Sequence, residues 1–454
     1  MNYDLVVIGG GPAGYLGAER AGQAGLRTLL IEKQYIGGVC LNVGCIPSKT
    51  LLYSAKIFDS VKHGSVYGVT AEGLKLDHSA IVDRKNKVVK ALTGGVRAQL
   101  KKHGVTVVEG FAQIDGKVDD GYAVRVGNDV YVGKRLLIAT GSAPAVPPIK
   151  GLKEGLERGF VLTSNEIFDL ETVPASLVVI GGGVIGLEMA SYFNSAGSKV
   201  TVVEMLDHIG GNIDLEISSI LQAEYEAKGV EFKLRTKVVE VTADSVVCEI
   251  NGETVTISAD KVLLSVGRKP VVQGFGLENI GVEVMKGAIT TDEQGRTNVP
   301  GVYAAGDVNG RSMLAHTAYR EAEVCINNMT GRRDRMTYDS IPMVIYTNPE
   351  VAAVGETEES AKQKGMDVET VKLSMRYSGR YLAENHAGRG ICKLVVDKKS
   401  RRIVGVNMIA NYVSEIIYGA GMMIDRFMTV EDVKRTVFPH PTVSEIIREC
   451  VFEL

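Results

Sequence analysis

Two stretches of the chain share one pattern of apolar and polar positions. Residues 5–8 and 177–180 are short apolar runs of the kind that forms a buried strand. Each run leads into Gly-x-Gly-x-x-Gly, a helical segment and a second apolar run that ends at a glutamate. The two copies align without a gap, which indicates an internal repeat. Its matching residues are Gly9, Gly11, Gly14 and Glu32 in the first copy and Gly181, Gly183, Gly186 and Glu204 in the second.

This repeat predicts two βαβ units of the type that binds dinucleotides. The glycines let the backbone approach a pyrophosphate, the helix N-terminus offers free N–H groups, and the acid accepts hydrogen bonds from a ribose. Two such sites in one chain indicate a tightly held FAD and an exchangeable nicotinamide dinucleotide. We expect NAD in the second site, because Glu204 would repel the 2′-phosphate of NADP and residues 205–209 contain no arginine to receive it.

The remaining pattern predicts an α/β protein with a different kind of domain at its C-terminal end. Residues 77–102 have the apolar spacing of one long helix, and short strands are expected at 105–108, 122–126 and 135–139. From residue 341 onward the pattern is that of a separate α+β lobe. We therefore predict two Rossmann-like dinucleotide-binding domains and a C-terminal α+β dimerisation domain. The expected boundaries are 1–148 for FAD binding, 149–270 for NAD binding, 271–340 for a central domain that completes the FAD site, and 341–454 for the interface domain.

Composition and charge narrow the class of protein. With 45% apolar and 23% charged residues among 454, the chain is typical of a globular protein with more than one core. A net charge of -3 gives no reason to expect nucleic acid or an anionic membrane as a partner. Apolar runs stay below the ~18 residues that span a bilayer. A strand begins directly after Asp4, without a signal or transit segment, so we expect a cytoplasmic protein.

Two of the six cysteines, Cys40 and Cys45, lie five positions apart. A disulfide that closes so small a ring stabilises a fold little, because it constrains few residues. We therefore interpret this pair as one that cycles between dithiol and disulfide. We expect the thiols of Cys248, Cys325 and Cys392 to be buried and free.

A histidine near the C-terminal end has the chemistry that such a cycle needs. Thiol–disulfide exchange proceeds through a thiolate, so a base of near-neutral pKa has to take the thiol proton. His440 lies five residues before Glu445, and a carboxylate so placed can fix the tautomer of the ring and stabilise its cation. Lys49 follows Cys45 by four residues, which places both on one face of a helix.

Taken together, these motifs resemble those of the pyridine nucleotide–disulfide oxidoreductase family over essentially the whole chain. The resemblance is carried by the segment from Cys40 to Lys49, the two dinucleotide patterns, Ala305-Gly306-Asp307, and the segment from His440 to Glu445. It implies a flavin-dependent disulfide oxidoreductase.

The resemblance also implies roles for residues around the flavin. Cys45 supplies the thiolate against the flavin ring, and Cys40 is the thiol that exchanges with the substrate. Lys49 and Glu188 pair near flavin N5. The further cofactor-binding residues that it implies are Lys49, Thr140, Gly141, Gly267, Asp307 at the ribityl chain, and Ala315 at the pyrimidine edge.

In the family pattern the catalytic base comes from the other subunit of a homodimer. The resemblance gives this role to His440, oriented by Glu445. The implied reaction is the oxidation of a dihydrolipoyl group by NAD through the disulfide and FAD. Because the chain carries no lipoyl domain, the group must arrive on a partner protein, from a 2-oxo acid dehydrogenase complex or the glycine cleavage system.

Two alternatives stay open at this point. One is another NAD(P)H-dependent disulfide reductase of the same family, similar to glutathione or mercuric reductase. Ser48 and Val184 stand where glutathione-type relatives carry lysine and tyrosine, and Cys450 stands alone where mercuric-type relatives have paired cysteines. We interpret Cys450 as a packing residue. The other alternative is a flavoprotein that keeps the fold without catalysis, which the complete set of redox residues argues against.

Overall fold

The computed structural model describes residues 2–454, which divide into two compact units, each drawn from three segments of the chain. The first unit combines the segment that ends at Thr50 with Val82–Ala145 and Gly267–Thr337. The second combines Leu51–Ile81, Val146–Val266 and Tyr338–Leu454. Two helices, α3 (Cys45–Lys62) and α4 (His78–Lys102), contribute residues to both units.

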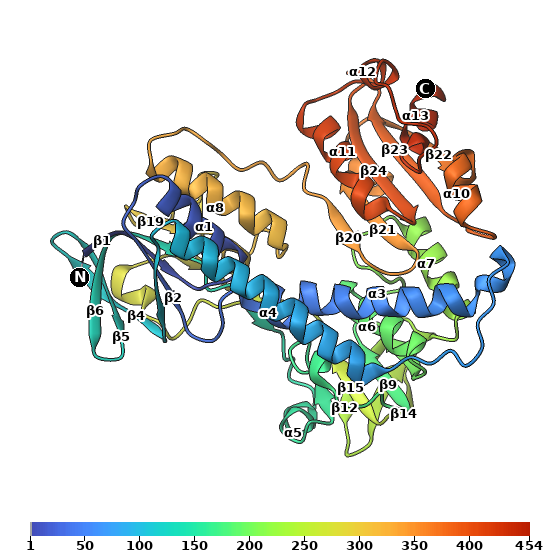
Figure 1. Ribbon diagram of the computed structural model, residues 1–454, viewed down its shortest axis with the longest axis horizontal. Coiled ribbons are helices and arrows are strands. Elements are labelled where there is room, and N and C mark those ends of the chain that lie inside the picture. Colours follow the sequence, from blue (N-terminus) through green and yellow to red (C-terminus); the bar gives the residue numbers. More distant parts are fainter. Residues whose placement is uncertain (1) are drawn as a thin grey trace. The chain divides into compact units, whose positions relative to one another are not determined.

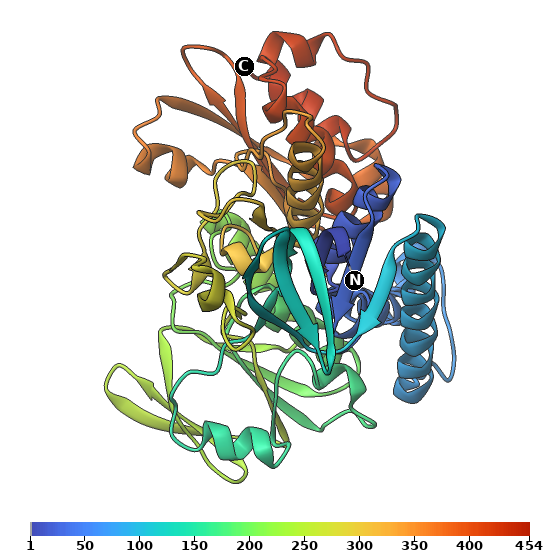
Figure 2. The ribbon, with the colours of Figure 1, turned by 90° about the vertical axis from the view of Figure 1, so that its left-hand side faces the viewer.

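The first unit is built on a sheet with strand order β3-β2-β1-β6-β5-β4, in which β19 pairs with β6. Strands β1, β2, β3, β6 and β19 are parallel, and β4 to β6 form an antiparallel extension, drawn in cyan at the centre of Figure 2. The strands are β1 (Asn2–Ile8), β2 (Thr28–Glu32), β3 (Thr106–Glu109), β4 (Ala112–Val118), β5 (Gly121–Val126), β6 (Asp129–Ile138) and β19 (Val302–Ala304).

The second half of strand β1, residues 5–8, is entirely apolar because both of its faces are buried. Leu5 and Val7 belong to the apolar core on one side of the sheet, and Val6 and Ile8 belong to the core on the other side. Continuous apolar runs are typical of parallel strands covered on both faces. On the first side, α1 (Pro12–Gln23) and α8 (Ala315–Met329) lie next to each other (Figure 1).

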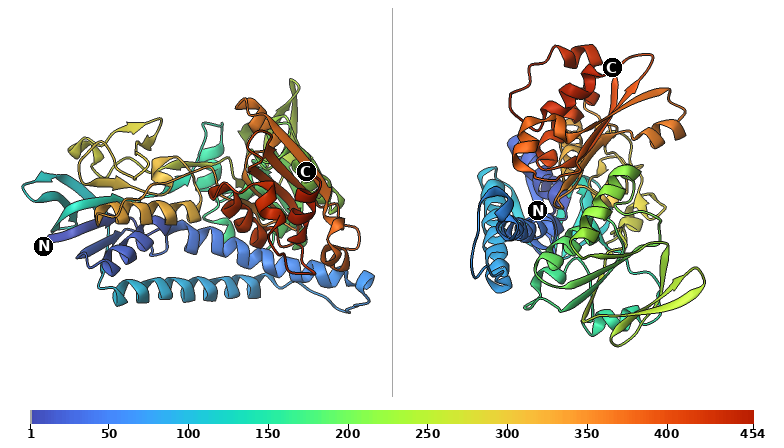
Figure 3. Two further views of the ribbon diagram at one scale, coloured as in Figure 1. Left: turned by 90° about the horizontal axis from the view of Figure 1, so that it is seen from above. Right: turned by 90° about the vertical axis from the view of Figure 1, so that its right-hand side faces the viewer.

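The remaining elements of the first unit are short, apart from its part of α4. The predicted helix over 77–102 is confirmed as α4, which runs without interruption (Figure 3, left). The other elements are α2 (Gly38–Val43), the strand pair β7 (Ser142–Pro144) and β16 (Arg268–Pro270), the strand pair β17 (Val284–Met285) and β18 (Ala288–Ile289), and the short 3-10 helices Leu277–Ile280 and Asp307–Asn309.

The second unit contains a parallel sheet that repeats the pattern of β1 and β2. Its strand order is β11-β10-β9-β15-β8, and an antiparallel sheet β12-β13-β14 accompanies it. The strands are β8 (Val161–Leu162), β9 (Ser176–Ile180), β10 (Lys199–Val203), β11 (Glu231–Lys233), β12 (Thr236–Val241), β13 (Ser245–Ile250), β14 (Glu253–Ser258) and β15 (Lys261–Leu264). The helices are α5 (Leu152–Glu157), α6 (Val184–Ser195) and α7 (Leu215–Ala227).

The C-terminal part of the second unit is an antiparallel sheet with order β20-β21-β24-β23-β22. Helix α11 packs on β21 and β24, and α13 packs on β22 and β23. The strands are β20 (Met343–Ile345), β21 (Glu350–Gly355), β22 (Val368–Ser374), β23 (Ile391–Asp397) and β24 (Ile403–Ala410). The helices are α9 (Glu358–Gln363), α10 (Gly379–Glu384), α11 (Val413–Asp425), α12 (Val430–Lys434) and α13 (Glu445–Phe452).

The predicted α/β fold class is confirmed, whereas the four domain boundaries stay predictions. Strand β6 begins at Asp129, earlier than expected, because its first residues pair with β5, and its pairing with β1 starts only at Val132. The pattern had not indicated β4 or the β12–β14 sheet.

Candidate active site

In the first repeat, the outer glycines are packed against backbone and the middle one faces open space. A Cβ on Gly9 would lie 2.3 Å from the oxygen of Ala139, and one on Gly14 would lie 1.8 Å from the oxygen of Gly9. A Cβ on Gly11 would meet nothing closer than 3.9 Å. Gly11 also begins α1 without a side-chain cap, so the N–H groups of the first turn remain available.

The second repeat has the same arrangement. A Cβ on Gly181 would lie 2.6 Å from the oxygen of Ser265, and one on Gly186 would lie 2.1 Å from the oxygen of Gly181. Gly183 has no atom within 4 Å of that position and begins α6 without a side-chain cap. Open space in front of a free helix N-terminus suits a pyrophosphate, so both turns fit a dinucleotide.

The acid at the end of β2 and the acid directly after β10 make matching hydrogen bonds. Glu32 Oε2 accepts from Gly10 N–H at 2.5 Å, and Glu204 Oε2 accepts from Gly182 N–H at 2.7 Å. The other oxygens accept from the N–H groups two residues on, at Gln34 and Leu206. Each carboxylate is thereby held at the glycine turn, where an adenosine ribose is expected.

A second group of polar residues in the first unit surrounds Asp307. Ser142 Oγ donates to Asp307 Oδ2 at 2.5 Å, and Arg268 Nε donates to Ser142 Oγ at 2.7 Å. Burial lowers the pKa of Arg268, which the negative charges of Asp307 and Cys45 partly offset. Neither Ser142 nor Arg268 was predicted from the sequence as a site residue, although each directly follows a predicted cofactor residue, Gly141 and Gly267.

Two other predicted cofactor residues of this unit lie just after β6 and at the start of α8. Thr140 follows β6 and its hydroxyl donates to the oxygen of Val271 at 2.7 Å. Ala315 begins α8, whose N-terminus has no side-chain cap. Glu321, further along α8, is buried and accepts from Gly306 N–H at 2.6 Å, which supports the turn before Asp307.

The two predicted redox cysteines are both free thiols and lie in contact. Cys40 belongs to α2, and Cys45 is the first residue of α3. A hydrogen bond with Cys45 and burial raise the pKa of Cys40, which Lys49 opposes. The raised pKa of Cys40 favours its protonated form, and the N-terminus of the 18-residue helix α3 is a position that favours an anion at Cys45.

Lys49 and Glu188 belong to different units, so their pairing stays a prediction. Lys49 lies one helical turn after Cys45 in α3, and its Nζ is 3.3 Å from Ser48 Oγ. Glu188 lies in α6, is 3% exposed, and accepts from the N–H of Tyr346 at 3.2 Å. The loop after β20 thus helps to orient this glutamate.

His440 and Glu445 lie in direct contact in the second unit. His440 Nδ1 donates to Glu445 Oε1 at 2.8 Å, and Thr442 N–H donates to Glu445 Oε2 at 2.7 Å. Burial raises the pKa of Glu445, but the bonds from Thr442 and His440 outweigh it and hold the pKa below its usual value. The imidazole is 79% exposed, so its Nε2 edge remains accessible to a partner.

The remaining cysteines are buried and free, as predicted. Burial raises the pKa of Cys248 to about 11, which keeps this thiol protonated and unreactive at neutral pH. Cys450 is fully buried and contacts Cys392, in agreement with a packing role.

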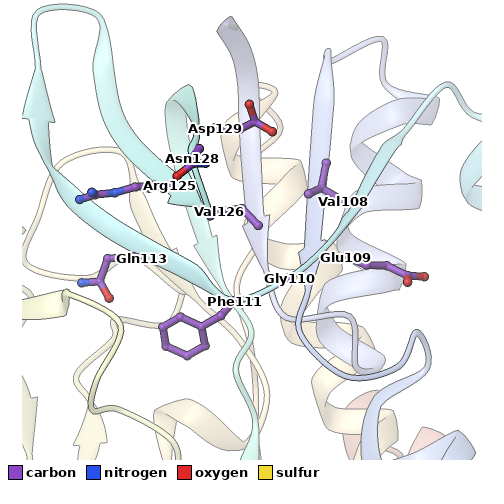
Figure 4. Close-up of a pocket in the computed structure, with 10 residues that line it drawn as sticks. Val108, Glu109, Gly110, Phe111, Gln113, Arg125, Val126, Asn128 and Asp129 are labelled. Carbon is purple, nitrogen blue, oxygen red and sulfur yellow. The ribbon is translucent and has the colours of Figure 1, made fainter.

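One open pocket of about 660 Å³ lies on the antiparallel extension of the first unit. Phe111, Gln113 and Arg125 are among the side chains around it (Figure 4). None of the predicted site residues lines this pocket, so it is not the candidate active site.

Comparison with known proteins identifies the class. Residues 3–322 match the family described as pyridine nucleotide-disulphide oxidoreductase, and residues 341–451 match the dimerisation domain of that family. The chain belongs to the pyridine nucleotide-disulphide oxidoreductase family. It is an oxidoreductase whose cofactors are FAD and NAD, as predicted. The dimerisation domain supports a homodimer.

Relatives cover almost the whole chain. The mitochondrial dihydrolipoyl dehydrogenase of Pisum sativum is 40% identical over 98% of this chain and 90% of its own length. The dihydrolipoyl dehydrogenase of Bacillus subtilis (strain 168) is 38% identical over 98% of this chain and 97% of its own. Among solved structures, the Cu(II) complex of the HOCl-induced flavoprotein disulfide reductase RclA from Escherichia coli has a TM-score of 0.88 at 28% identity, with 100% of both chains covered.

Within residues 2–454, no helix combines the length and the apolar character that a membrane span requires.

Proposed function

We propose that the chain oxidises a protein-bound dihydrolipoyl group to its disulfide, with NAD as electron acceptor. The observation that carries the proposal lies in the first unit. Gly37 N–H, directly before the helix of Cys40, donates to the oxygen of Gly10 in the glycine turn at 2.8 Å. The thiol pair is thereby attached to the turn that fits a dinucleotide. This contact supports direct electron exchange between the thiols and a flavin bound in the same unit.

The residues of the chain have the following tasks in this reaction. One substrate thiol attacks the Cys40 sulfur of the oxidised pair, and Cys45 leaves as a thiolate. His440 takes the proton of the attacking thiol at Nε2, because its Nδ1 donates to Glu445. The second substrate thiol displaces Cys40, which releases the oxidised lipoyl group and leaves both cysteines reduced. FAD, when bound, carries the two electrons from the pair to NAD.

Glu188 and Lys49 complete the proposed site near flavin N5. Glu188 is buried and fixed by a backbone N–H, and Lys49 shares a helix face with Cys45. We assign each of them a place near flavin N5, where its charge would assist the passage of hydride to the nicotinamide.

The proposed partners are a second copy of this chain and a lipoyl-bearing protein. In the dimer, His440 and Glu445 of one protomer would serve the cysteines of the other, which agrees with the exposed imidazole. The lipoyl carrier would belong to a 2-oxo acid dehydrogenase complex or the glycine cleavage system, and we propose the cytoplasm as the location.

We expect NAD to be preferred over NADP by about a hundredfold or more in kcat/KM, because a 2′-phosphate would face the Glu204 carboxylate. Glu204→Arg is expected to narrow this preference. Comparable catalytic efficiencies of the unchanged protein with the two dinucleotides would contradict the assignment.

A steady-state comparison tests the proposed function. The FAD-loaded protein is assayed with dihydrolipoamide and NAD, and separately with glutathione disulfide and NADPH. Turnover in the first assay alone supports the proposal, and Cys45→Ser should remove it. Turnover in the second assay alone would instead identify a disulfide reductase that works in the opposite direction.

A further inference from the structure

The second dinucleotide site contains a basic residue beside its ribose-binding acid. Arg235 lies between β11 and β12, far along the chain from Glu204. Its backbone N–H donates to the oxygen of Leu206 at 2.8 Å, and Leu206 N–H donates to Glu204 Oε1 at 2.8 Å. Thr236 N–H donates to the oxygen of Glu204 at 2.9 Å. The turn that carries Arg235 is therefore bonded to the loop that carries Glu204.

The backbone at this position also has an uncommon conformation. Arg235 has a φ of 52°, in the left-handed region that non-glycine residues rarely adopt. The two backbone hydrogen bonds donated by Arg235 and Thr236 stabilise this turn. They hold the backbone of Arg235 against Leu206, two residues along the chain from Glu204, the acid at the expected position of the adenosine ribose.

An acid on the same loop forms an ion pair with the guanidinium of Arg235. Arg235 Nη2 lies 3.4 Å from Asp207 Oδ2. His208 Nδ1 donates to Asp207 Oδ1 at 2.7 Å, and His208 Nε2 lies 3.0 Å from the oxygen of Gly211. The bond from His208, with Arg235 adding to it, holds the pKa of Asp207 below its usual range. Asp207 is thus an oriented anion at neutral pH.

The chemical difference between the two dinucleotides indicates a role for this ion pair. NADP differs from NAD by a doubly charged 2′-phosphate, which arginine receives better than any other side chain. We propose that Asp207 and Arg235 form a second determinant of dinucleotide choice, in which Asp207 prevents Arg235 from receiving a 2′-phosphate. The proposal rests on the proposed function, in which this repeat holds NAD.

The charge of Asp207 can be removed without breaking the hydrogen bonds of the Glu204 carboxylate, because the side chains of the two acids have different partners. Glu204 is bonded to the N–H groups of Gly182 and Leu206, whereas Asp207 is bonded to two side chains. Removal of the Asp207 charge therefore releases Arg235 while Glu204 keeps its place. Because the Arg235 side chain is 73% exposed, solvent screens the new interaction, and a moderate effect is expected.

The test is direct binding to the FAD-loaded protein, measured by calorimetry with two probes. Adenosine 2′,5′-bisphosphate carries the phosphate in question, and adenosine 5′-monophosphate lacks it. The readout is the ratio of the two affinities. In Asp207→Asn we expect this ratio to shift about tenfold toward the bisphosphate. In the double variant Asp207→Asn, Arg235→Gln the ratio should return to within about twofold of the unchanged protein.

A matched control removes one negative charge elsewhere in the same unit. Glu253 is exposed on β14, and Glu253→Gln should leave the ratio unchanged. An unchanged ratio in Asp207→Asn, or a shift that survives the loss of Arg235, would overturn the proposal. The proposed function fails separately, through absent turnover of dihydrolipoamide with NAD, while the affinity ratios remain measurable.

Discussion

At the scale of single residues, Cys40 and Cys45 are neighbours with unequal surroundings. Cys40 is buried and has a raised pKa, because it donates a hydrogen bond within the pair and lies away from water. Cys45 is partly exposed at a helix N-terminus, where an anion is favoured. We therefore predict that Cys45, and not Cys40, forms the thiolate.

This inequality predicts different spectra for two serine variants of the FAD-loaded protein. Cys40→Ser should show a long-wavelength thiolate–flavin absorption band near neutral pH without any reductant, because Cys45 is left as a free thiolate. Cys45→Ser should show no such band, even after two-electron reduction. A yellow Cys40→Ser protein without the band would reverse the assignment of the two sulfurs.

Glu445 predicts an effect on the rate through the orientation of His440. Because base catalysis contributes at least about a hundredfold, Glu445→Gln should lower kcat with dihydrolipoamide by roughly that factor. Glu449→Gln on the same helix, where Glu449 pairs with Arg448, is the matched control and should stay within about twofold. Equal rates for both variants would exclude the orienting role.

The lowered pKa of Glu445 makes the contribution of this pair to the stability of the fold depend on pH. A carboxyl group whose folded-state pKa lies below its unfolded value stabilises the fold above the unfolded pKa. That contribution is lost as the pH falls through the lowered value. The free energy of unfolding should therefore lose this contribution only in acid. In Glu445→Gln this part of the decrease in stability with falling pH should be absent.

At the scale of elements, different glycines within each glycine turn serve close packing and ligand binding. In the second repeat, a Cβ at Gly186 meets backbone, whereas a Cβ at Gly183 enters open space in front of α6. Gly183 has a φ of -79°, which alanine adopts without strain.

Gly186→Ala and Gly183→Ala should accordingly fail in different ways. Gly186→Ala is expected to lower the thermal unfolding midpoint by several degrees, because overpacking costs about 1–3 kcal/mol. Gly183→Ala should keep the midpoint and weaken NADH binding about tenfold or more in a fluorescence titration, because the methyl group takes the place of the pyrophosphate. Loss of stability in both variants would mean that the space at Gly183 is not a ligand site.

The elements also show what a sequence can predict and what it cannot. Strands β1 and β9 follow from apolar runs, because burial on both faces leaves no polar position. The helix over 77–102 follows from its spacing. The ion pair of Arg235 with Asp207 and the bond from Gly306 to Glu321 do not follow, because each joins distant positions through tertiary packing. In α8, Glu321 has the sequence character of an ordinary polar helix residue.

At the scale of the whole molecule, the match to a dimerisation domain and the exposed His440 predict a shared active site. Cys45→Ser and His440→Ala should each be nearly inactive as homodimers. Co-expression should restore roughly a quarter of the original activity, since half of the dimers are mixed and each has one intact site under two-fold symmetry. Mixed dimers without this recovery would place the histidine in its own chain or outside the reaction.

The late pairing of β19 with β6 has a consequence for the synthesis of the protein. Until Val302–Ala304 leave the ribosome, the second half of β6 has an unpaired edge beside the finished strands β1 and β2. At normal elongation rates this edge stays open for a time on the order of ten seconds or more. An open strand edge is a template for wrong pairing between chains. The nascent chain is therefore most exposed to aggregation in the middle of translation, and slow elongation or a lack of chaperones should reduce its yield more than that of a protein whose first sheet is contiguous.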